Sequence, residues 1–358
     1  MGLKLERRAQ ISSRANLGAP LLAVMLTLIG GLVVFSALGK DPLHAFKVFF
    51  FNPVKDLYGL SELLLKATPL MLIAMGLAVG FRANVWNIGA EGQFIAGAIA
   101  GSGVALAFDQ TGGVWVIPAM MLAGTAGGAF WAAIPALLRS RFNANEILVS
   151  LMLVYVAQLL VSWVVHGPWK DPMGFNFPQT RMFEDAAVLS PLITGTRLTI
   201  AFPIAVAVLV AGYVFVHRSF LGFQMRVTGQ AEGAARHAGF PVKRAIWIGM
   251  LAGGATAGLA GLGEVAGPMG QLTEHVSNDY GFSAIIVAFV GRLTPVGIFL
   301  ASLLMALMVM GGEQAQQYLA LPSSVSKVFQ GMLLFFLLGT DVFARYRLRW
   351  TPANHRNA

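Results

Sequence analysis

The sequence predicts an all-α integral membrane protein with about ten transmembrane helices, and two features of its composition carry that prediction. Of the 358 residues, 56% are hydrophobic and only 11% are charged, whereas roughly a quarter of the residues in an average soluble domain are charged. The 41 glycines fit the same class, because glycine is more frequent in membrane-spanning helices than in soluble ones. A single soluble core is therefore excluded.

Ten apolar stretches supply the expected helices, since a crossing needs about 20 mostly apolar residues. The seven clearest stretches are residues 19–38, 60–80, 113–138, 146–166, 198–217, 245–263 and 324–343. Three are weaker: 88–108 is glycine-rich and contains Glu91, and 282–291 and 295–311 are short runs separated by three residues. These three are expected to be short or broken crossings. The first stretch is expected to stay as an anchor helix, because it is too long for a cleavable signal.

Ten crossings place both termini on one side of the membrane, and the basic residues indicate which side. With the N-terminus in the cytoplasm, 17 of the 25 Lys and Arg residues lie inside and six lie outside, as the positive-inside rule requires. The predicted organisation is a cytoplasmic tail (1–18), one transmembrane domain (19–343) and a second cytoplasmic tail (344–358), with an outer loop at 167–197 and an inner loop at 218–244. The formal charge of +9 is thus a topological signal, and we expect no nucleic-acid partner.

The most unusual part of the sequence is residues 84–93, which place three amides, an indole and a carboxylate at the start of an apolar run. Polar groups at membrane depth usually face the protein interior or a water-filled cavity, and two glycines in this segment allow a break in the helix. We therefore predict that Asn87, Glu91 and Gln93 line a substrate pathway beside a discontinuous helix. The alternative, that Glu91 and Gln93 only cap a helix and tie it to its neighbours, is open at this stage.

Several kinds of chemistry are missing from the sequence. It has no cysteine, which excludes disulfides and thiolate metal sites, and its histidines lack the spacing of a metal site. It also lacks a phosphate-binding loop of the G-x-x-x-x-G-K-[ST] type, and Glu91 is the only carboxylate in the interior of a predicted span. We predict no catalytic residue, no metal and no cofactor, and if transport is active its energy comes from a partner.

Four parts of the chain carry a family resemblance. They are residues 87–93 (NIGAEGQ), 234–239 (AARHAG) with the following Lys243-Arg244, 281–297 (GFSAIIVAFVGRLTPVG), and 311–316 (GGEQAQ) together with 330–336 (QGMLLFF). The set resembles the permease subunits of ATP-binding cassette (ABC) importers in the group that carries ribose, branched-chain amino acids and nucleosides. Within that group it looks most like the larger permease of the nucleoside-type simple-sugar importers.

This resemblance implies a multi-pass subunit of the plasma or inner membrane that forms the translocation pathway for a nucleoside or simple sugar. It also implies three partners: an ABC ATP-binding subunit that hydrolyses ATP, a second and related permease, and a periplasmic or lipid-anchored substrate-binding protein.

The inner loop resembles the family's segment for coupling to the ATPase. Its stretch 229–239 has the composition of a short surface helix ended by glycine. The residues that match the coupling segment are Glu232, Ala234, Ala235, Arg236 and Gly239. Alternatives at this stage are an ion-coupled secondary transporter or channel that acts without an ATPase, a membrane-embedded enzyme and a passive scaffold.

Overall fold

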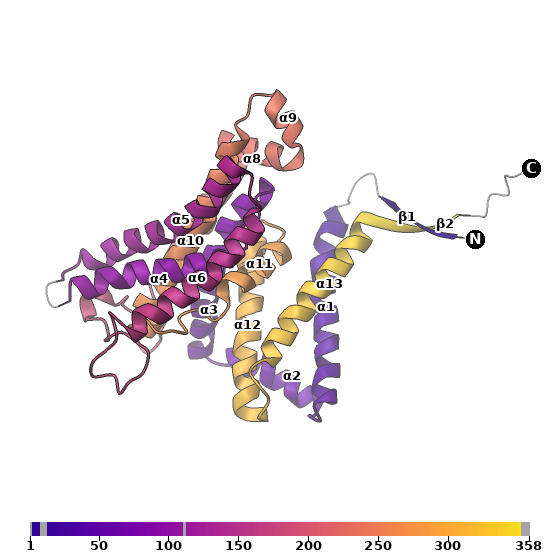
Figure 1. The fold of residues 1–358 in the computed structure, drawn as a ribbon. Helices are drawn as coiled ribbons and strands as arrows, with labels where there is room; N and C mark the ends of the chain where they lie inside the picture. Colours follow the sequence, from indigo (N-terminus) through magenta and orange to yellow (C-terminus); the bar gives the residue numbers. More distant parts are fainter. Residues whose placement is uncertain (1, 8–12, 110–111, 352–358) are drawn as a thin grey trace, which may run out of the picture. The chain divides into compact units, whose positions relative to one another are not determined.

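The computed structural model describes residues 2–7, 13–109 and 112–351, and these are almost entirely helical (Figure 1). The helices are α1 (Ser13–Ala37), α2 (Pro42–Phe50), α3 (Leu57–Arg82), α4 (Ala90–Ala107), α5 (Val116–Phe142), α6 (Glu146–His166), α7 (Ala201–Arg218), α8 (Phe220–Gln230), α9 (Glu232–His237), α10 (Val242–Glu264), α11 (Tyr280–Val290), α12 (Pro295–Leu319) and α13 (Val325–Arg345). Shorter turns are the 3-10 segments η1 (Asn52–Val54) and η2 (Asp185–Ala187) and the π-helical turn η3 (Val265–Met269), which continues α10. Strand β1 (Gly2–Arg7) pairs antiparallel with β2 (Tyr346–Thr351).

The prediction of an all-α membrane protein is confirmed, and each of the ten predicted apolar stretches contains a helix. Within the described residues, eight helices are long and apolar enough to cross a membrane: α1, α3, α5, α6, α7, α10, α12 and α13. The other two predicted crossings correspond to α4, with 18 residues, and to α11, with only 11. One expectation was wrong: the stretch 295–311 is not short, because α12 continues through two glycines and Glu313 to Leu319.

The chain divides into two compact units, a larger one at Val54–Ala306 and a smaller one formed by Met1–Pro53 and Leu307–Ala358. In the smaller unit α1 packs along α13 and next to α2. Phe35, Phe49 and Phe329 are completely buried there, and the rings of Phe49 and Phe329 stack with centroids 4.6 Å apart. An aromatic cluster is therefore the core of this unit.

The larger unit is built around α3, of whose apolar stretch 83% is buried. Helix α10 packs against α3, α4 and α5, and glycines let these backbones come close. A Cβ on Gly97 of α4 would lie 2.2 Å from the Cα of Gly258 of α10, and a Cβ on Gly128 of α5 would lie 2.2 Å from the Gly254 carbonyl oxygen. Contacts between small residues of this kind are how helices associate in a membrane.

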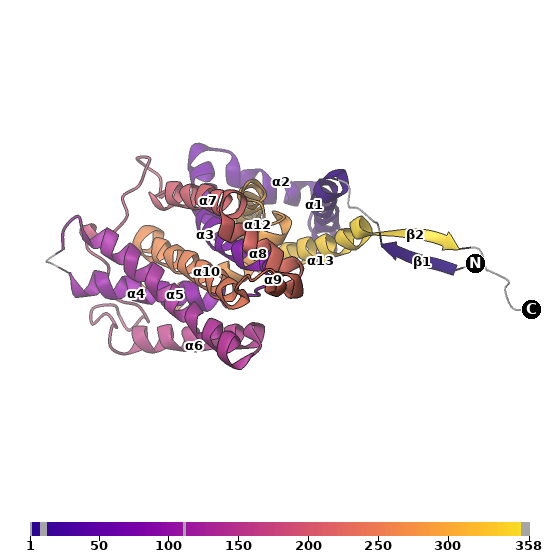
Figure 2. The same ribbon diagram turned by 90° about the horizontal axis from the view of Figure 1, so that it is seen from above.

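Seen from above, α7 and α6 lie on opposite sides of the layer that contains α10, α5 and α4 (Figure 2). Helix α7 contacts α3, and α6 contacts α4. The outer face of α6 exposes large apolar side chains, among them Tyr155, Leu159 and Trp163. A face of this composition suits lipid or another membrane subunit.

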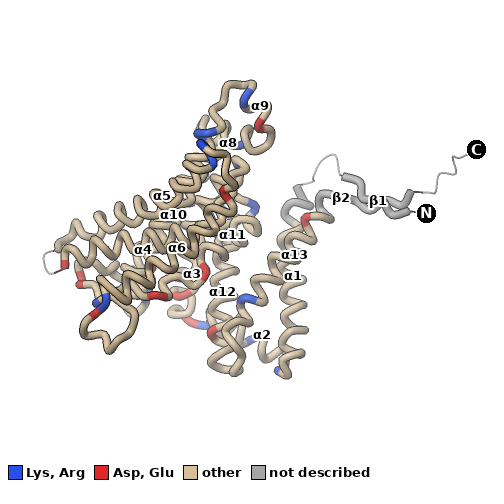
Figure 3. Tube along the Cα trace, in the orientation of Figure 1, with Lys and Arg blue, Asp and Glu red and all other residues tan. Residues whose placement is uncertain are grey.

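The two ends of the larger unit differ in structure and in charge. Helices α8 and α9 form most of the predicted inner loop and protrude at one end, where Lys and Arg residues gather (Figure 3). The predicted outer loop, 167–197, follows the opposite end of α6 and contains turns, η2 and two isolated bridges instead of long helices. This asymmetry agrees with the predicted cytoplasmic side of the inner loop.

Candidate functional site

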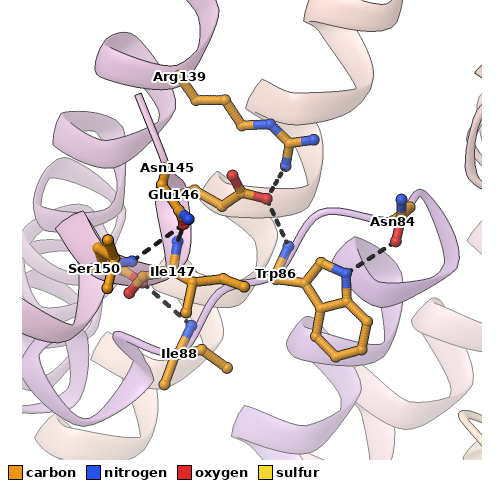
Figure 4. Close-up of polar contacts among 9 residues, drawn as sticks. Asn84, Trp86, Ile88, Arg139, Asn145, Glu146, Ile147 and Ser150 are labelled. Atoms are coloured by element: carbon orange, nitrogen blue, oxygen red, sulfur yellow. Dashed lines mark hydrogen bonds and ion pairs between the residues drawn. The ribbon is translucent and has the colours of Figure 1, made fainter. Parts of the chain in front are cut away.

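The chain between α3 and α4 is not helical, and α6 holds it in place (Figure 4). The peptide N–H of Trp86 donates to a carboxylate oxygen of Glu146 at 3.5 Å, and the same oxygen pairs with Arg139 of α5. One turn further along α6, the Ser150 hydroxyl oxygen accepts the N–H of Ile88 at 3.3 Å. This segment connects two predicted crossings, and side chains of α6 satisfy two of its backbone N–H groups, which water would otherwise have to satisfy. Within the predicted run 88–108, α4 is continuous from Ala90 to Ala107.

Two asparagines shape the same region. Asn84 has a φ of 57°, a left-handed conformation that asparagine tolerates better than most residues, and its side-chain oxygen accepts the indole N–H of Trp86 at 2.9 Å. Asn145 begins α6, because its side-chain oxygen accepts the N–H groups of Ile147 and Leu148 at 2.9 and 3.3 Å. An asparagine in this role satisfies donors at the helix start, and it places Glu146 and Ser150 where they meet the break.

Asn87 and Gln93 form a reciprocal amide pair inside the protein. Asn87 Nδ2 donates to Gln93 Oε1 at 2.8 Å, and Gln93 Nε2 donates to Asn87 Oδ1 at 2.9 Å. The Asn87 oxygen also accepts the N–H of Gly89 at 3.1 Å, which closes the turn that enters α4. Both residues are only 1% exposed. These two predicted pathway residues thus connect the break to the first turn of α4, with their polar atoms directed at each other and at that turn.

Glu91 links α4 to the half-length helix α11. Its carboxylate accepts the N–H of Gly281, in the first turn of α11, at 2.6 Å. A Cβ on Gly281 would lie 2.2 Å from the backbone nitrogen of Glu91, so only glycine permits this approach. The 11 residues of α11 span about 16 Å, roughly half of a hydrocarbon core that is about 30 Å thick. Glu91 therefore occupies the positive N-terminal end of a half-length helix.

A cavity of about 230 Å³ lies beside Glu91. Its walls come from α4, from α6 and from the segment 274–279 that leads into α11, with the lining residues Glu91, Ile95, Gln158, Glu274, His275, Ser277 and Asp279. The Ser162 hydroxyl of α6 donates to Glu274 at 2.8 Å, which holds the segment against α6. Three carboxylates thus line one cavity, and none of its described lining residues is Lys or Arg.

Of the three predicted pathway residues, Glu91 lines this cavity. Sequence reasoning missed the other polar lining residues, Gln158 among them. Gln158 is an amide in the middle of a predicted span, and that position is the kind of signal that marks an intramembrane polar site. The segment 274–279 gave no such signal, because it lies between two predicted spans and only the fold brings it to Glu91.

The predicted coupling residues form an exposed helix at the basic end of the larger unit. Glu232 and Arg236 pair across one turn of α9 at 2.6 Å, and Ala234 is exposed beside them. Ala235 is completely buried and anchors the helix. Gly239, with a φ of 76°, follows its end in a left-handed conformation that glycine adopts without strain. The predicted short surface helix ended by glycine is confirmed.

A basic hollow of about 590 Å³ lies beside α9. It is bounded by the C-terminal end of α5, by α9 and by the start of α10, and its charged lining residues are Arg139, Arg141, Glu232, Arg236 and Lys243. Four of these five side chains are cations. Arg139 pairs with Glu146 and Arg236 pairs with Glu232, so the positive surplus of the hollow comes from Arg141 and Lys243. This surplus suits a partner surface with acidic groups.

An ion pair fastens the outer loop to α3. Arg197 donates from Nε to Glu62 Oε1 at 3.0 Å and from Nη2 to Glu62 Oε2 at 2.5 Å. Hydrogen bonding to this carboxylate raises the pKa of Arg197 above its ordinary value, so the guanidinium stays charged throughout the physiological range. The two-point contact fixes the end of the loop relative to the central helix.

Comparison with known proteins gives consistent matches. Residues 59–338 match the family described as branched-chain amino acid transport system / permease component. A glucose ABC transporter permease of Haloferax volcanii is 37% identical over 97% of this chain and 93% of its own length. A nucleoside ABC transporter permease of Lactococcus lactis is 28% identical over 89% of each chain, and a guanosine ABC transporter permease of Bacillus subtilis is 28% identical over 90% of this chain and 93% of its own. No solved structure gives a significant match.

The helical fold and these matches define a multi-pass membrane protein of the plasma membrane. The chain belongs to the branched-chain amino acid transport system / permease component family, and it is a permease subunit of the ABC transporter type. The resemblance drawn from residues 87–93, 234–244, 281–297 and 311–336 is confirmed. The family works with an ATPase and with substrate-binding partners, so an ion-coupled carrier that acts alone is not favoured.

Proposed function

We propose that this permease forms the translocation pathway of an ABC importer for an uncharged, hydroxyl-rich solute such as a nucleoside or a simple sugar. ATP is hydrolysed in a separate ATP-binding subunit, and a second, related permease and an outer solute-binding protein complete the assembly. One observation carries the proposal: a polar cavity lies beside Glu91, between α4, α6 and the segment that leads into α11, in a protein whose relatives are ABC transporter permeases.

The backbone beside the cavity supports a pathway. Residues 274–279 are largely non-helical and lead into a half-length helix, and irregular backbone at membrane depth is tolerated only inside protein or along a water-filled cavity. Gln158 is exposed on α6 among apolar neighbours. An exposed amide on a membrane helix is costly in lipid, so we infer that this strip of α6 faces water or the second permease.

The chemistry of the cavity supports the solute class. The carboxyl oxygens of Glu91, Glu274 and Asp279 accept hydrogen bonds, and sugar or ribose hydroxyls donate them. The described lining contains no Lys or Arg that could pair with a carboxylate on the solute, so it favours an uncharged solute. At about 230 Å³ the cavity is smaller than the roughly 300–1,000 Å³ of pockets for drug-sized ligands. The printed names of the relatives specify glucose, nucleosides and guanosine, which are small hydroxylated solutes.

In this proposal Asn87 and Gln93 act indirectly, by positioning Glu91. Their amide pair fixes the turn before α4, and Glu91, in the first turn of α4, lines the cavity. The wall of the cavity is thus held in one geometry, although few of its residues contact the solute. A translocation site needs this combination, since it must release what it admits.

Coupling to the ATPase is assigned to α9. Glu232, Ala234 and Arg236 form an exposed surface on a helix anchored by the buried Ala235, and the basic hollow beside it offers further cations. Movement of the ATP-binding subunits would reach the membrane helices through this contact, because α9 packs on α8 and α10. The permeases would then expose the cavity alternately to the two sides.

The absence of cysteine from the sequence allows a direct test of the pathway. Single cysteines are introduced as Gln158→Cys and, for comparison, at its exposed neighbour as Leu159→Cys, and the assembled importer is treated with a charged, membrane-impermeant thiol reagent. We expect labelling of Gln158→Cys, slowed by glucose or guanosine, and little labelling of Leu159→Cys. Equal labelling at the two positions would show that the cavity is not the aqueous pathway.

Uptake by reconstituted vesicles tests the function itself. The wild-type complex should accumulate solute only with its ATP-binding subunit and ATP. Glu91→Gln should reduce uptake at least tenfold while assembly persists, because the amide oxygen still accepts the Gly281 N–H. Uptake by the permease in vesicles without an ATPase would contradict the proposal.

A further inference from the structure

Three aromatic rings meet on the part of the chain that connects α7 to α10. The ring centroids of Phe220 and Phe223 lie 6.3 Å apart, and the ring of Phe240 stands edge-on to both, at 6.1 and 6.2 Å. Phe220 and Phe223 belong to α8, whereas Phe240 follows α9, so the fold brings the three rings together. We refer to these three residues as the inner aromatic cluster, and their mutual contacts make them a single patch.

The inner aromatic cluster is open to its surroundings. The side chains of Phe220 and Phe223 are 66% and 46% exposed, and Phe240 is half-buried. Helix α8 buries Gly222 and Met225 on one face and presents Phe220 and Phe223, three residues apart, on another. Large apolar groups that remain exposed together on a folded surface mark an interaction site.

The cluster lies where two apolar helices end on the inner side. Helix α7 ends at Arg218, two residues before Phe220, and α10 begins at Val242, two residues after Phe240, and both helices are long and apolar enough to cross a membrane. Two residues of extended chain span at most about 7 Å. Two of the three rings are therefore held at the level where crossing helices leave the hydrocarbon core and meet the lipid headgroups.

The charges near the cluster are predominantly positive. Between positions 218 and 244 the sequence has five Lys and Arg residues and one carboxylate, Glu232, which is held in an ion pair within α9. Arg218 and Arg244 are both exposed, and Arg244 lines a small hollow together with Phe240. Exposed aromatic rings combined with a surplus of basic residues are typical of segments that lie on anionic membranes.

We propose that the inner aromatic cluster, together with Arg218 and Arg244, is a docking surface for anionic phospholipids of the inner leaflet. The rings insert among the headgroups, and the two arginines pair with lipid phosphate groups. This contact requires neither a solute nor an ATPase, so it does not depend on the proposed function. Docked there, α8 is held at the membrane surface, and α9 is held with it, because the two helices pack together.

Because the sequence has no cysteine, a single label can probe the cluster. Phe220→Cys and Phe223→Cys, each carrying a fluorophore, are prepared as the full-length permease in nanodiscs of phosphatidylcholine and phosphatidylglycerol with a spin label near the lipid headgroup. The control is Gly233→Cys on α9, where nothing lies within 4 Å of a new Cβ. We expect the spin-labelled lipid to quench both cluster positions at least threefold more than the control. Equal quenching at cluster and control positions would overturn the proposal.

Two further measurements test the lipid charge and the occupant. In nanodiscs of phosphatidylcholine alone, quenching at Phe223→Cys should fall at least twofold, and adding Arg218→Gln/Arg244→Gln should lower quenching in the mixed lipid to the same level. Equal quenching in the two lipid compositions would contradict docking to anionic lipid. Addition of the ATP-binding subunit should leave quenching by lipid unchanged. If the subunit abolishes it, a protein covers the cluster and the proposal is wrong.

Discussion

The entry to α4, residues 84–93, and the protruding helix α9 are both rich in polar groups, but these groups are buried at the entry to α4 and exposed on α9. Asn87, Glu91 and Gln93 are 1–2% exposed, and each is hydrogen-bonded within the chain. The side chains of Glu232 and Arg236 are 53% and 69% exposed and pair with each other. An unsatisfied polar group in the membrane costs several kcal/mol, whereas an exposed ion pair contributes about 0–1 kcal/mol. Substitutions at the entry to α4 should therefore mainly lower the stability of the fold, and substitutions in α9 should mainly weaken contacts with partner proteins.

The largest expected effect is at the contact between α4 and α11. In Gly281→Ala the new Cβ would lie 2.2 Å from the backbone of Glu91, so α11 must move away. We expect a loss of about 3 kcal/mol in the free energy of unfolding, at the upper end of overpacking effects, measured by detergent-induced unfolding followed by tryptophan fluorescence. Gly331→Ala is the matched control, because nothing lies within 4 Å of its new Cβ, and it should leave stability unchanged or slightly raised.

The next effect concerns the amide pair. Gln93→Leu leaves Asn87 Nδ2 without its partner in a buried site, while Asn87 Oδ1 keeps only the Gly89 N–H. The substitution should cost about 1–3 kcal/mol of unfolding free energy. The double variant Asn87→Leu/Gln93→Leu removes both members and should recover part of that loss, since two apolar groups leave less polar surface unsatisfied. A double variant whose loss equals the sum of the single losses would show that the pair is not coupled.

A smaller effect is expected at the ion pair between α5 and α6 that contacts the α3–α4 connection. Glu146→Gln keeps an oxygen for the Trp86 N–H but removes the charge opposite Arg139, in a pair whose side chains are 12% and 20% exposed. We expect a loss of about 1 kcal/mol in unfolding free energy, which is at the upper end for a partly exposed pair. Salt should reduce the difference between wild type and variant. Glu184→Gln, in the exposed outer loop, is the control and should change stability by less than about 0.5 kcal/mol.

The helices were predictable from sequence because hydropathy and span length determine them, and even α11 was visible as a short run. The extent of α12 was not, since two glycines and Glu313 end the apolar pattern although the helix continues to Leu319. Glu91 stood out as a carboxylate in an apolar stretch. The surroundings of Glu91 could not be derived from the sequence. The amide pair of Asn87 and Gln93 joins the non-helical α3–α4 connection to α4, and residues 274–279 reach Glu91 only through the fold.

The smallest expected effect on stability comes from α9, where the functional effect should be large. Glu232→Ala/Arg236→Ala removes an exposed ion pair and should change the unfolding free energy by less than about 0.5 kcal/mol. Solute-stimulated ATP hydrolysis by the assembled complex should nevertheless fall at least fivefold, because the proposed contact with the ATPase is lost.

The exchange variant Glu232→Arg/Arg236→Glu decides what the pair does. It retains an ion pair across the same turn but inverts the charges that α9 presents to a partner. If the pair only supports the helix, coupling survives the exchange; if α9 contacts the ATPase through these charges, coupling is lost as in the alanine variant. If coupling is lost in both variants while stability is unchanged, α9 acts as a partner surface. The entry to α4 differs, because its polar groups are hydrogen-bonded within the chain and the loss of any of these bonds should first lower stability.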